Sequence, residues 1–377
     1  MEIEIGKLIK KAKLIRCGDG EYPVLSMTMH DGLMFQNDRF KKQIASIDQS
    51  QYQVVHRHQL VESFPIDEGV LAVQELTDMG IVSPAYKIWD VDMEKVVPKY
   101  LEFALRAPRS IEYYKSKLRG TTARRRSIPD AEFCAMRIEY PSLNEQKIIV
   151  DIIEKAKQVI NLRSLELDTL DALIKARFVE LFGDPVSNSY GLPEATLPEL
   201  GEFGRGISKH RPRNDSELLG GEYPLIQTGD VANAGLYITS YNSTYSELGL
   251  KQSKMWEKGT LCITIAANIA KTAILTFDAC FPDSVVGFTA NEKTNNIFIH
   301  YWFLFFQAIL ESQAPESAQK NINLKILSEL RVIVPEKEKQ DEFVDFIKQV
   351  DKSKVAVQKA LDETQLLFDS LMQKYFI

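Results

Sequence analysis

The feature that most constrains the fold is an ungapped internal repeat, in which residues 141–182 recur as residues 335–376. The repeat separation of 194 residues is about half of the 377-residue chain. Few of the paired residues are identical, but the apolar positions agree, and this indicates a repeated packing arrangement. The sequence therefore predicts two similar halves with pseudo-twofold symmetry. The matched pairs include Pro141 and Pro335, Gln146 and Gln340, Ile153 and Ile347, and Phe182 and Phe376.

Each copy of the repeat has the 4,3 spacing of apolar residues that is typical of a coiled-coil helix. After Pro141 and Pro335, neither copy contains proline or glycine, and the first ends before Gly183 and Pro185, residue types that terminate helices. Because the domain between the two helices must return the chain, we expect them to pair antiparallel. The alternative is two separate amphipathic helices, each lying on its own domain. The predicted interface residues are Ile149, Ile153, Ile160, Leu167, Leu170, Ile174, Phe343, Ile347, Val350, Val357, Leu361 and Phe368.

The segments ahead of the two helices also resemble each other. Residues 22–25 (Tyr-Pro-Val-Leu) are similar to residues 223–226 (Tyr-Pro-Leu-Ile), and each opens a series of short β-like stretches. A buried strand is predicted after Gly69 and again after Gly259, and a helical stretch follows in both halves. The predicted fold class is therefore α+β, with two mixed α/β domains joined by two long helices paired as an antiparallel coiled coil. The predicted domains are residues 1–140, 141–184, 185–334 and 335–377.

The charge pattern indicates local cationic surfaces on an acidic body. The net charge of −6 argues against a protein that coats nucleic acid by bulk attraction. Basic residues nevertheless cluster at 7–16, 119–126 and 205–213, as expected of a DNA-binding protein that also docks other proteins. The first residues are acidic, unlike a signal peptide, and no apolar stretch is long enough to span a bilayer, so we expect a cytoplasmic protein with no membrane partner.

The order of these elements resembles the DNA-specificity (S) subunit of type I restriction-modification systems. The resemblance rests on residues 138–146 (Ile-Glu-Tyr-Pro-Ser-Leu-Asn-Glu-Gln), on the helix through residues 176–182, and on a weaker second copy from Val332 to Gln340. It covers essentially the whole chain. Each short motif is weakly specific, and their duplication makes the match more specific.

This resemblance implies a non-catalytic subunit. The two globular segments would be target-recognition domains, each reading one half of a bipartite site in double-stranded DNA. The helices would fix the distance between the half-sites and hold two modification (methyltransferase) subunits, with restriction subunits as further partners. We expect no cofactor on this chain, because S-adenosylmethionine, ATP and Mg²⁺ would belong to the partner subunits.

Cationic and amide side chains in exposed loops are the candidates for DNA contact, because Lys and Arg bind phosphates and Arg, Lys, Asn and Gln reach base edges. One such loop lies in the first half at 119–126, and two lie in the second half, at 206–214 and 319–325. The first loop lacks the Gln-Lys-Asn-Ile-Asn run found at 319–323, so the two halves need not use their loops in the same way. The predicted DNA-binding residues are Arg119, Arg124, Arg125, Arg126, Lys209, Arg211, Arg213, Gln319, Lys320, Asn321 and Lys325.

Three other functions are open on the sequence alone. The helices are also typical of a coiled-coil scaffold or adaptor, and a specificity protein can act without a restriction complex. A remote third possibility is a nuclease, because Pro129-Asp130 with Glu145, Gln146 and Lys147 has the outline of a PD-ExK site. Against a nuclease, Glu145 begins a predicted helix, whereas such sites hold Mg²⁺ with carboxylates on adjacent strands. The scattered cysteines do not have the spacing of a metal site.

Overall fold

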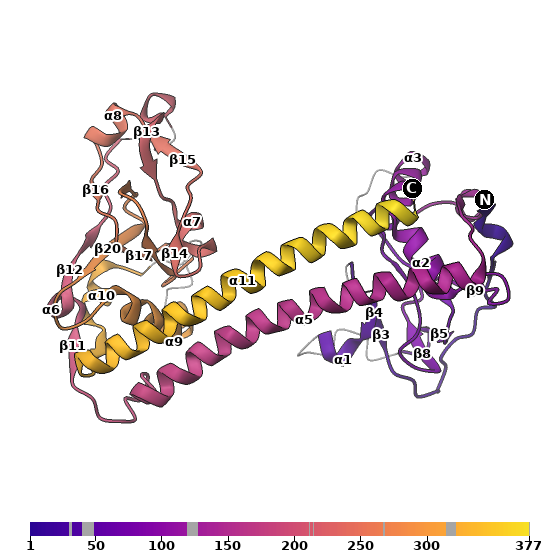
Figure 1. Ribbon diagram of the computed structural model, residues 1–377, viewed down its shortest axis with the longest axis horizontal. Coiled ribbons are helices and arrows are strands. Elements are labelled where there is room, and N and C mark those ends of the chain that lie inside the picture. Colours follow the sequence, from indigo (N-terminus) through magenta and orange to yellow (C-terminus); the bar gives the residue numbers. More distant parts are fainter. Residues whose placement is uncertain are drawn as a thin grey trace. The chain divides into compact units, whose positions relative to one another are not determined.

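The computed structural model describes residues 1–29, 32–39, 49–118, 127–210, 212–213, 215–266, 268–313 and 322–376. It contains two compact units. The first unit comprises Met1–Leu165 and Gln358–Ile377, and the second comprises Glu166–Val357. The boundary falls inside two long helices, α5 (Leu143–Phe182) and α11 (Lys337–Tyr375), so each unit holds part of both helices (Figure 1).

The first unit is built on a four-stranded antiparallel sheet in the order β2-β9-β6-β7. Its strands are β2 (Ile9–Lys11), β9 (Lys87–Val91), β6 (Leu60–Glu62) and β7 (Leu71–Val73). Two-stranded pairs are formed by β1 (Glu2–Glu4) with β10 (Arg137–Glu139), β3 (Leu25–Met27) with β4 (Leu33–Phe35), and β5 (Gln53–His56) with β8 (Met79–Val82). The shorter helices of the unit are α1 (Gln36–Arg39), α2 (Pro98–Arg106), α3 (Pro108–Lys117) and α4 (Asp130–Ala135).

The second unit contains a five-stranded sheet in the order β12-β20-β17-β18-β14 and a four-stranded sheet in the order β15-β13-β19-β16. The five strands are β12 (Gly201–Arg205), β20 (Val285–Ala290), β17 (Leu261–Thr264), β18 (Thr272–Leu275) and β14 (Tyr237–Ile238). The four are β15 (Ser243–Tyr245), β13 (Leu219–Leu225), β19 (Ala279–Cys280) and β16 (Met255–Trp256), and β11 (Glu194–Thr196) pairs with β21 (Arg331–Ile333). The helices are α6 (Leu197–Leu200), α7 (Thr228–Asn233), α8 (Glu247–Lys251), α9 (Asn296–Gln313) and α10 (Leu324–Glu329).

The duplication extends into the sheets. The order β2-β9-β6-β7 in the first unit matches β12-β20-β17-β18 in the second, and every neighbouring pair in both is antiparallel. Helices α4 and α10, and strands β10 and β21, occur at the 194-residue separation of the repeat. The chain therefore builds the same arrangement twice, and the predicted α+β fold with two mixed domains is confirmed.

The two Tyr-Pro segments occupy equivalent positions in the two units. Val24 forms a parallel bridge with Ile81, on strand β8, and Leu225 pairs in parallel with Cys280, on strand β19. Strand β8 in turn pairs with β5, and β19 pairs with β16, both antiparallel. The sequence similarity of these segments thus reflects a shared place in the fold.

Aromatic packing anchors the long helices in the second unit. Phe178 and Phe182 of α5 contact Phe343 of α11 and Phe298 of α9, with ring centroids 5.1–5.7 Å apart. All four side chains are fully buried. Burying a side chain of this size stabilises the fold by roughly 1.5–3 kcal/mol. The end of α5 and the start of α11 are therefore part of this unit's core.

The other ends of the same helices belong to the core of the first unit. Ile149 and Ile153 of α5 lie in one buried cluster with Met372 of α11 and with Phe376. The Phe376 ring packs against Tyr100 of α2 at 5.2 Å between centroids. Each long helix thus contributes one end to each unit.

Inside each unit the two helices run antiparallel, as predicted. In the second unit Arg177 forms an ion pair with Glu342, and Asp171 accepts a hydrogen bond from Lys354 at 2.7 Å, so residue numbers rise on one helix as they fall on the other. Among the predicted interface residues, those that are buried are Ile149, Ile153, Ile174, Phe343, Ile347, Val350 and Val357. Those that are half-buried are Ile160, Leu167, Leu170, Leu361 and Phe368.

A buried glutamine fixes the start of each long helix. The Gln146 amide donates to Pro141 O and accepts from Val97 N, both at 2.9 Å. Its repeat partner Gln340 donates to Pro335 O at 2.9 Å and to Lys293 O at 3.0 Å, and accepts from the Thr294 hydroxyl at 3.0 Å. Both side chains are fully buried. Each of the two matched glutamines therefore holds the proline-containing turn before its helix against other residues of the same unit.

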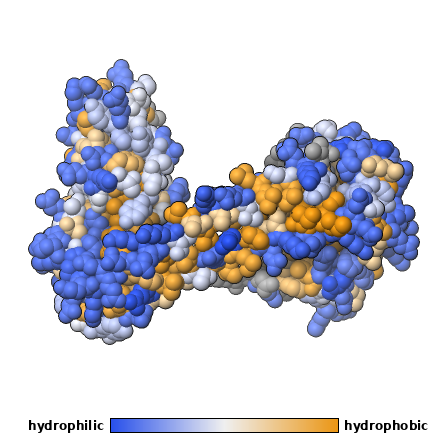
Figure 2. Space-filling model, in the orientation of Figure 1, coloured by the Kyte–Doolittle hydropathy of each residue, from blue (hydrophilic) through white to orange (hydrophobic). Residues whose placement is uncertain are grey.

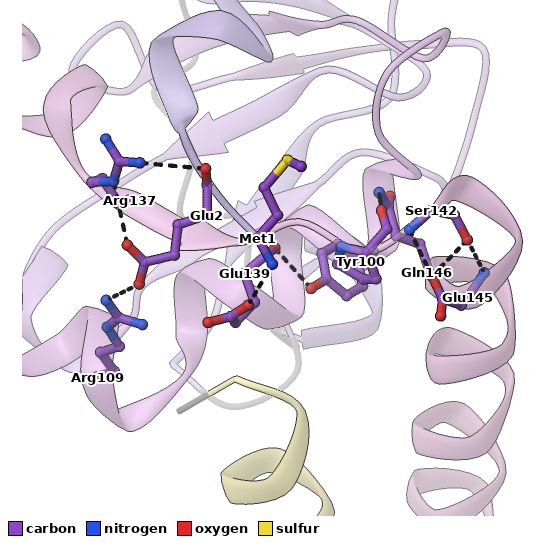
Figure 3. Close-up of polar contacts among 10 residues, drawn as sticks. Met1, Glu2, Tyr100, Arg109, Arg137, Glu139, Ser142, Glu145 and Gln146 are labelled. Carbon is purple, nitrogen blue, oxygen red and sulfur yellow. Dashed lines mark hydrogen bonds and ion pairs between the residues drawn. The ribbon is translucent and has the colours of Figure 1, made fainter.

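The junction of β1, β10 and α5 in the first unit is held by further polar contacts (Figure 3). Glu2 lies between Arg137 and Arg109, and the hydrogen bond from Arg109 is the main cause of its lowered pKa. The Tyr100 hydroxyl donates to Glu139 O at 2.9 Å. Glu145 accepts from the backbone N–H of Ser142 at 2.8 Å, which caps the first turn of α5.

Within the described part of the chain, no helix has both the length and the apolar character that a membrane span requires.

We predict that Gln340→Leu destabilises the second unit by roughly 1–3 kcal/mol for each hydrogen-bonding group left buried without a partner. The affected groups are the carbonyls of Pro335 and Lys293 and the Thr294 hydroxyl. Chemical unfolding followed by tryptophan fluorescence measures the change. Gln349→Leu is the matched control, because Gln349 is exposed on the same helix. Equal unfolding midpoints for the two variants would contradict the assigned role.

A second prediction concerns His300 on α9, which is buried and shares a 2.9 Å hydrogen bond with the Thr272 hydroxyl. Burial lowers its pKa from 6.5 to about 4. Between these pH values the unfolded chain binds a proton that the folded chain does not, so stability falls as pH falls from 6.5 to 4. The slope approaches 1.4 kcal/mol per pH unit, for a loss of about 3 kcal/mol in all.

His300→Gln should flatten this part of the stability-against-pH curve, whereas the same change at exposed His210 should not. Unfolding can be followed with Trp89→Phe as background, because Trp256 and Trp302 then report on the second unit alone. An unchanged slope in the His300 variant would show that other groups cause the acid sensitivity.

Candidate nucleic-acid interface

In the second unit, the basic loop that follows β12 is fixed by contacts of its backbone. Gly206 packs so closely on residues 281–282 that a Cβ there would collide with two carbonyl oxygens. Ile207 O accepts from the Ser253 hydroxyl at 2.9 Å. The Gln252 side-chain oxygen accepts from the backbone N–H groups of Lys209 and His210, at 2.7 and 3.1 Å. The backbone is thus held in place while the side chains of Lys209 and Arg213 are exposed.

Asp283 organises two arginines beside this loop. Its carboxylate forms an ion pair with the Arg213 guanidinium, and its backbone carbonyl accepts from Arg205 Nε at 2.9 Å. On the other side of the loop, His210 Nε2 lies 3.2 Å from Asp215. The pKa of Asp215 is lowered, first by the Glu217 backbone N–H and then by His210, so this carboxyl stays ionised at neutral pH.

Two cavities open beside Arg213. One has a volume of about 280 Å³, and the other about 300 Å³. Arg213 and Ser284 line both of them. The first is otherwise lined by Ser208, Leu219, Leu225, Gln227, Thr228, Tyr245 and Pro282, and the second by Arg205, Ile265, Ala266, Asp283, Ile322 and Asn323.

The second cavity brings together two segments that the sequence analysis named separately. Arg213 comes from the predicted loop 206–214, and Asn323 comes from the predicted loop 319–325. Asn323 caps α10 by accepting from the Ile326 backbone N–H at 2.9 Å, and exposed Lys325 follows in the first turn. Arg213 of one segment and Asn323 of the other therefore line the same cavity of the second unit.

Several predicted DNA-binding residues lie outside the described residues. They are Arg119, Arg124, Arg125, Arg126, Arg211, Gln319, Lys320 and Asn321. Lys209, Arg213 and Lys325 are described.

In the first unit, carboxylates pair with the described cations beside α4. Asp130 contacts Lys11 at 2.6 Å and Lys87 at 2.9 Å, and Lys87 also contacts buried Glu62 at 2.9 Å. Burial raises the pKa of Glu62, an effect that Lys87 opposes. Lys117 pairs with Glu132 at 3.1 Å. These described cations of the first unit therefore have carboxylate partners.

The remote nuclease reading has no support in the geometry. Glu145 caps α5, and Asp130 pairs with two lysines, so both carboxylates have structural partners. Within the described residues, no group of three or more His, Cys, Asp or Glu side chains has the arrangement of a metal site.

Apolar side chains remain exposed along the two long helices, and Figure 2 shows orange surface over them. On α5 they are Ile148, Val159, Leu162, Leu165, Leu173 and Val179, and on α11 they are Val355, Leu366 and Leu367. In the first unit, a groove of about 350 Å³ lies beside the helices, lined by Phe103, Arg106, Lys157, Ile160, Asn161, Gln365, Phe368 and Met372. Clustered apolar exposure of this kind marks interaction surfaces.

Comparison with known proteins identifies the domain to which this surface belongs. Residues 194–364 match the type I restriction modification DNA specificity domain. The match covers 171 of the 377 residues. The match includes the basic loop, both cavities and the start of α11. It agrees with the prediction of a non-catalytic specificity subunit.

Individual relatives extend the similarity beyond the matched domain. A protein of Methanocaldococcus jannaschii that carries the name of the MjaX type I restriction enzyme specificity subunit is 22% identical over 270 residues. The alignment covers 68% of this chain and 62% of that relative, so the chain spans less than two thirds of the relative's length.

Two solved structures share the fold over the whole chain. The S subunit of a type I restriction-modification system from M. genitalium has a TM-score of 0.59 and 14% identity, and 96% of that chain is covered. A chain from a structural study of complex assembly and conformational transition of a type I restriction-modification system has a TM-score of 0.61 and 16% identity, with 97% covered. The resemblance stated from the sequence is confirmed.

Sequence reasoning missed the residues that organise the basic loop. Gln252 and Asp283 contact the loop across 43 and 70 residues of sequence, and no local pattern indicates such contacts. Gln227 and Thr228 were also missed, although they directly follow the second Tyr-Pro segment. The conserved place of that segment in both units is the signal that could have directed attention to them.

Proposed function

We propose that this chain is the specificity subunit of a type I restriction-modification complex and that it reads a bipartite site in double-stranded DNA. The observation that carries the proposal is the duplication. Two units with the same sheet order share two helices that run antiparallel. Each unit would read one half-site, and the helices would set the gap between the half-sites.

The DNA contacts would come from local cations, because the chain as a whole carries a net charge of −6. In the second unit Lys209, Arg213 and Lys325 are exposed, and Arg213 lines a cavity together with Asn323. Lysine contacts with phosphate supply affinity without sequence information, and arginine and amide side chains reach base edges. The predicted residues at 119–126 and 319–321 would add to these contacts.

The partners would be two modification subunits, one for each half-site, together with restriction subunits. Exposed apolar residues on α5 and α11, such as Leu162, Leu173 and Leu366, give the helices a surface suited to protein docking. S-adenosylmethionine, ATP and Mg²⁺ would act on those partners. This function places the protein in the cytoplasm with the DNA. A scaffold without DNA recognition, and a solitary specificity protein, are the competing functions that the experiments below test.

We expect the chain, purified with its modification subunit, to direct adenine methylation to one discontinuous motif. Sequencing of methylated adenines in a host that expresses both subunits measures this. The modification subunit without this chain is the control, and it should methylate no such motif. A contiguous motif, or equal methylation with and without this chain, would count against the proposal and favour a scaffold.

Helix length should determine the gap in that motif. Four alanines inserted between Leu165 and Glu166, and four more between Val357 and Gln358, lengthen both helices by about 6 Å. The gap between half-sites should grow by about two base pairs, at 3.4 Å per base pair, while the recognised bases stay the same. Sequencing of methylated adenines again reads the result.

The matched control places four alanines after Gly191, which lies in an exposed loop beyond the end of α5. This insertion leaves both helices at their natural length and should leave the gap unchanged. If the gap between the half-sites does not change when both helices are lengthened, the proposed spacer role is wrong.

A further inference from the structure

We propose that Arg213, oriented by Asp283, reads a guanine in the half-site bound by the second unit. The inference rests on the proposed function and deepens it, because it assigns a base-reading residue and the base that it recognises. Three observations support it: the ion pair, the position between two cavities, and a matched glutamine contact in the first unit.

The ion pair orients the arginine. Arg213 Nη2 donates to the Asp283 carboxylate, and the Asp283 backbone is itself held by Arg205. A guanidinium has five N–H donors in a planar fork, so one bond to a carboxylate does not exhaust it. The remaining donors suit the O6 and N7 acceptors of guanine, which arginine binds in bidentate fashion in the major groove. An arginine already fixed in direction loses less side-chain entropy on binding.

The same ion pair disfavours a purely phosphate role. Asp283 compensates the charge of Arg213, and its carboxylate would lie close to any phosphate bound there. Exposed Lys209, on the same fixed loop, is better suited to a phosphate. We therefore assign affinity mainly to Lys209 and base discrimination to Arg213.

The surroundings of Arg213 suit the edge of a base. The cavity on one side has the exposed amide of Gln227 and the hydroxyls of Thr228 and Ser284 beside the apolar Leu219 and Pro282. A mixture of donors, acceptors and apolar surface is what base-edge recognition needs. Each polar group there can reach a neighbouring base of the same half-site.

The first unit shares one feature of this arrangement, a glutamine that contacts a basic segment. Its Tyr-Pro segment lies 201 residues before that of the second unit, and Gln51 lies 201 residues before Gln252. Gln51 accepts from the Arg16 guanidinium, in the basic segment that follows β2. Both units therefore hold a basic segment with a matched glutamine next to the Tyr-Pro segment. The two units share a fold but differ in the residues at this position, as expected if each unit binds a different half-site.

The test uses the complex of this chain with its modification subunit and a set of labelled duplexes. The set contains the methylated motif and variants in which each base pair is replaced in turn. The wild-type complex should discriminate against replacement of one G·C pair in one half-site by about 5- to 150-fold. Arg213→Ala should lose that discrimination at this pair alone and keep it in the other half-site, which also shows that the variant is folded.

Asp283→Asn should relax the same position, because the asparagine keeps the shape and removes the orienting charge. Lys251→Ala is the control, since Lys251 is exposed in the same unit and lines neither cavity. The Lys251→Ala complex should discriminate among the duplexes as the wild-type complex does.

Three outcomes overturn the inference while leaving the proposed function intact. They are an Arg213→Ala complex that weakens equally on all duplexes, an Arg213→Ala complex that discriminates as the wild type does, and a motif in which no relaxed position is a G·C pair. A wild-type complex with no discontinuous motif would instead overturn the proposed function, and this inference with it.

Discussion

The fold depends on covering the apolar stripes of two long helices. Helix α5 has 40 residues and α11 has 39, and most helix stability in proteins comes from packing of the apolar face. Phe178, Phe182 and Phe343 bury that face in the second unit, and Ile153 with Phe376 does so in the first. The Pro-Gln turn before each helix then fixes where the helix begins. Both units are therefore built around the same two helices, α5 and α11.

The helices were predictable and the sheets were not. Apolar spacing, Gly183 and the paired Pro141 and Pro335 are local signals, and α5 and α11 lie inside the predicted segments 141–184 and 335–377. Strand order depends on contacts between distant residues, such as the pairing of β12 with β20, and short buried strands have no periodicity that fixes their neighbours. The repeated sheet became visible only through its topology, because few residues outside the Tyr-Pro segments match in sequence.

The candidate interface was predictable to a similar degree. The charges of Lys209 and Arg213 and their neighbouring glycine indicated an exposed basic loop, and the structure places them on one. What the sequence could not supply is the pairing of Arg213 with Asp283, which joins residues 70 positions apart. From the sequence, Arg213 is one cation among several. The ion pair shows that its guanidinium has a fixed direction beside a cavity.

The two units share a topology but differ in the residues that form their surface ion pairs. Around α4 in the first unit, Asp130 and Glu62 neutralise Lys11 and Lys87, so the cations there stabilise the fold. Around α10 in the second unit, exposed Lys325 pairs with Glu329, and the adjoining cavity is lined by Arg213, which pairs with Asp283. The two copies of a duplicated fold can thus keep the same buried contacts, such as those of Gln146 and Gln340, while their surface residues differ. Two surfaces of different chemistry on one duplicated fold would suit the asymmetric, two-part DNA site of the proposed function.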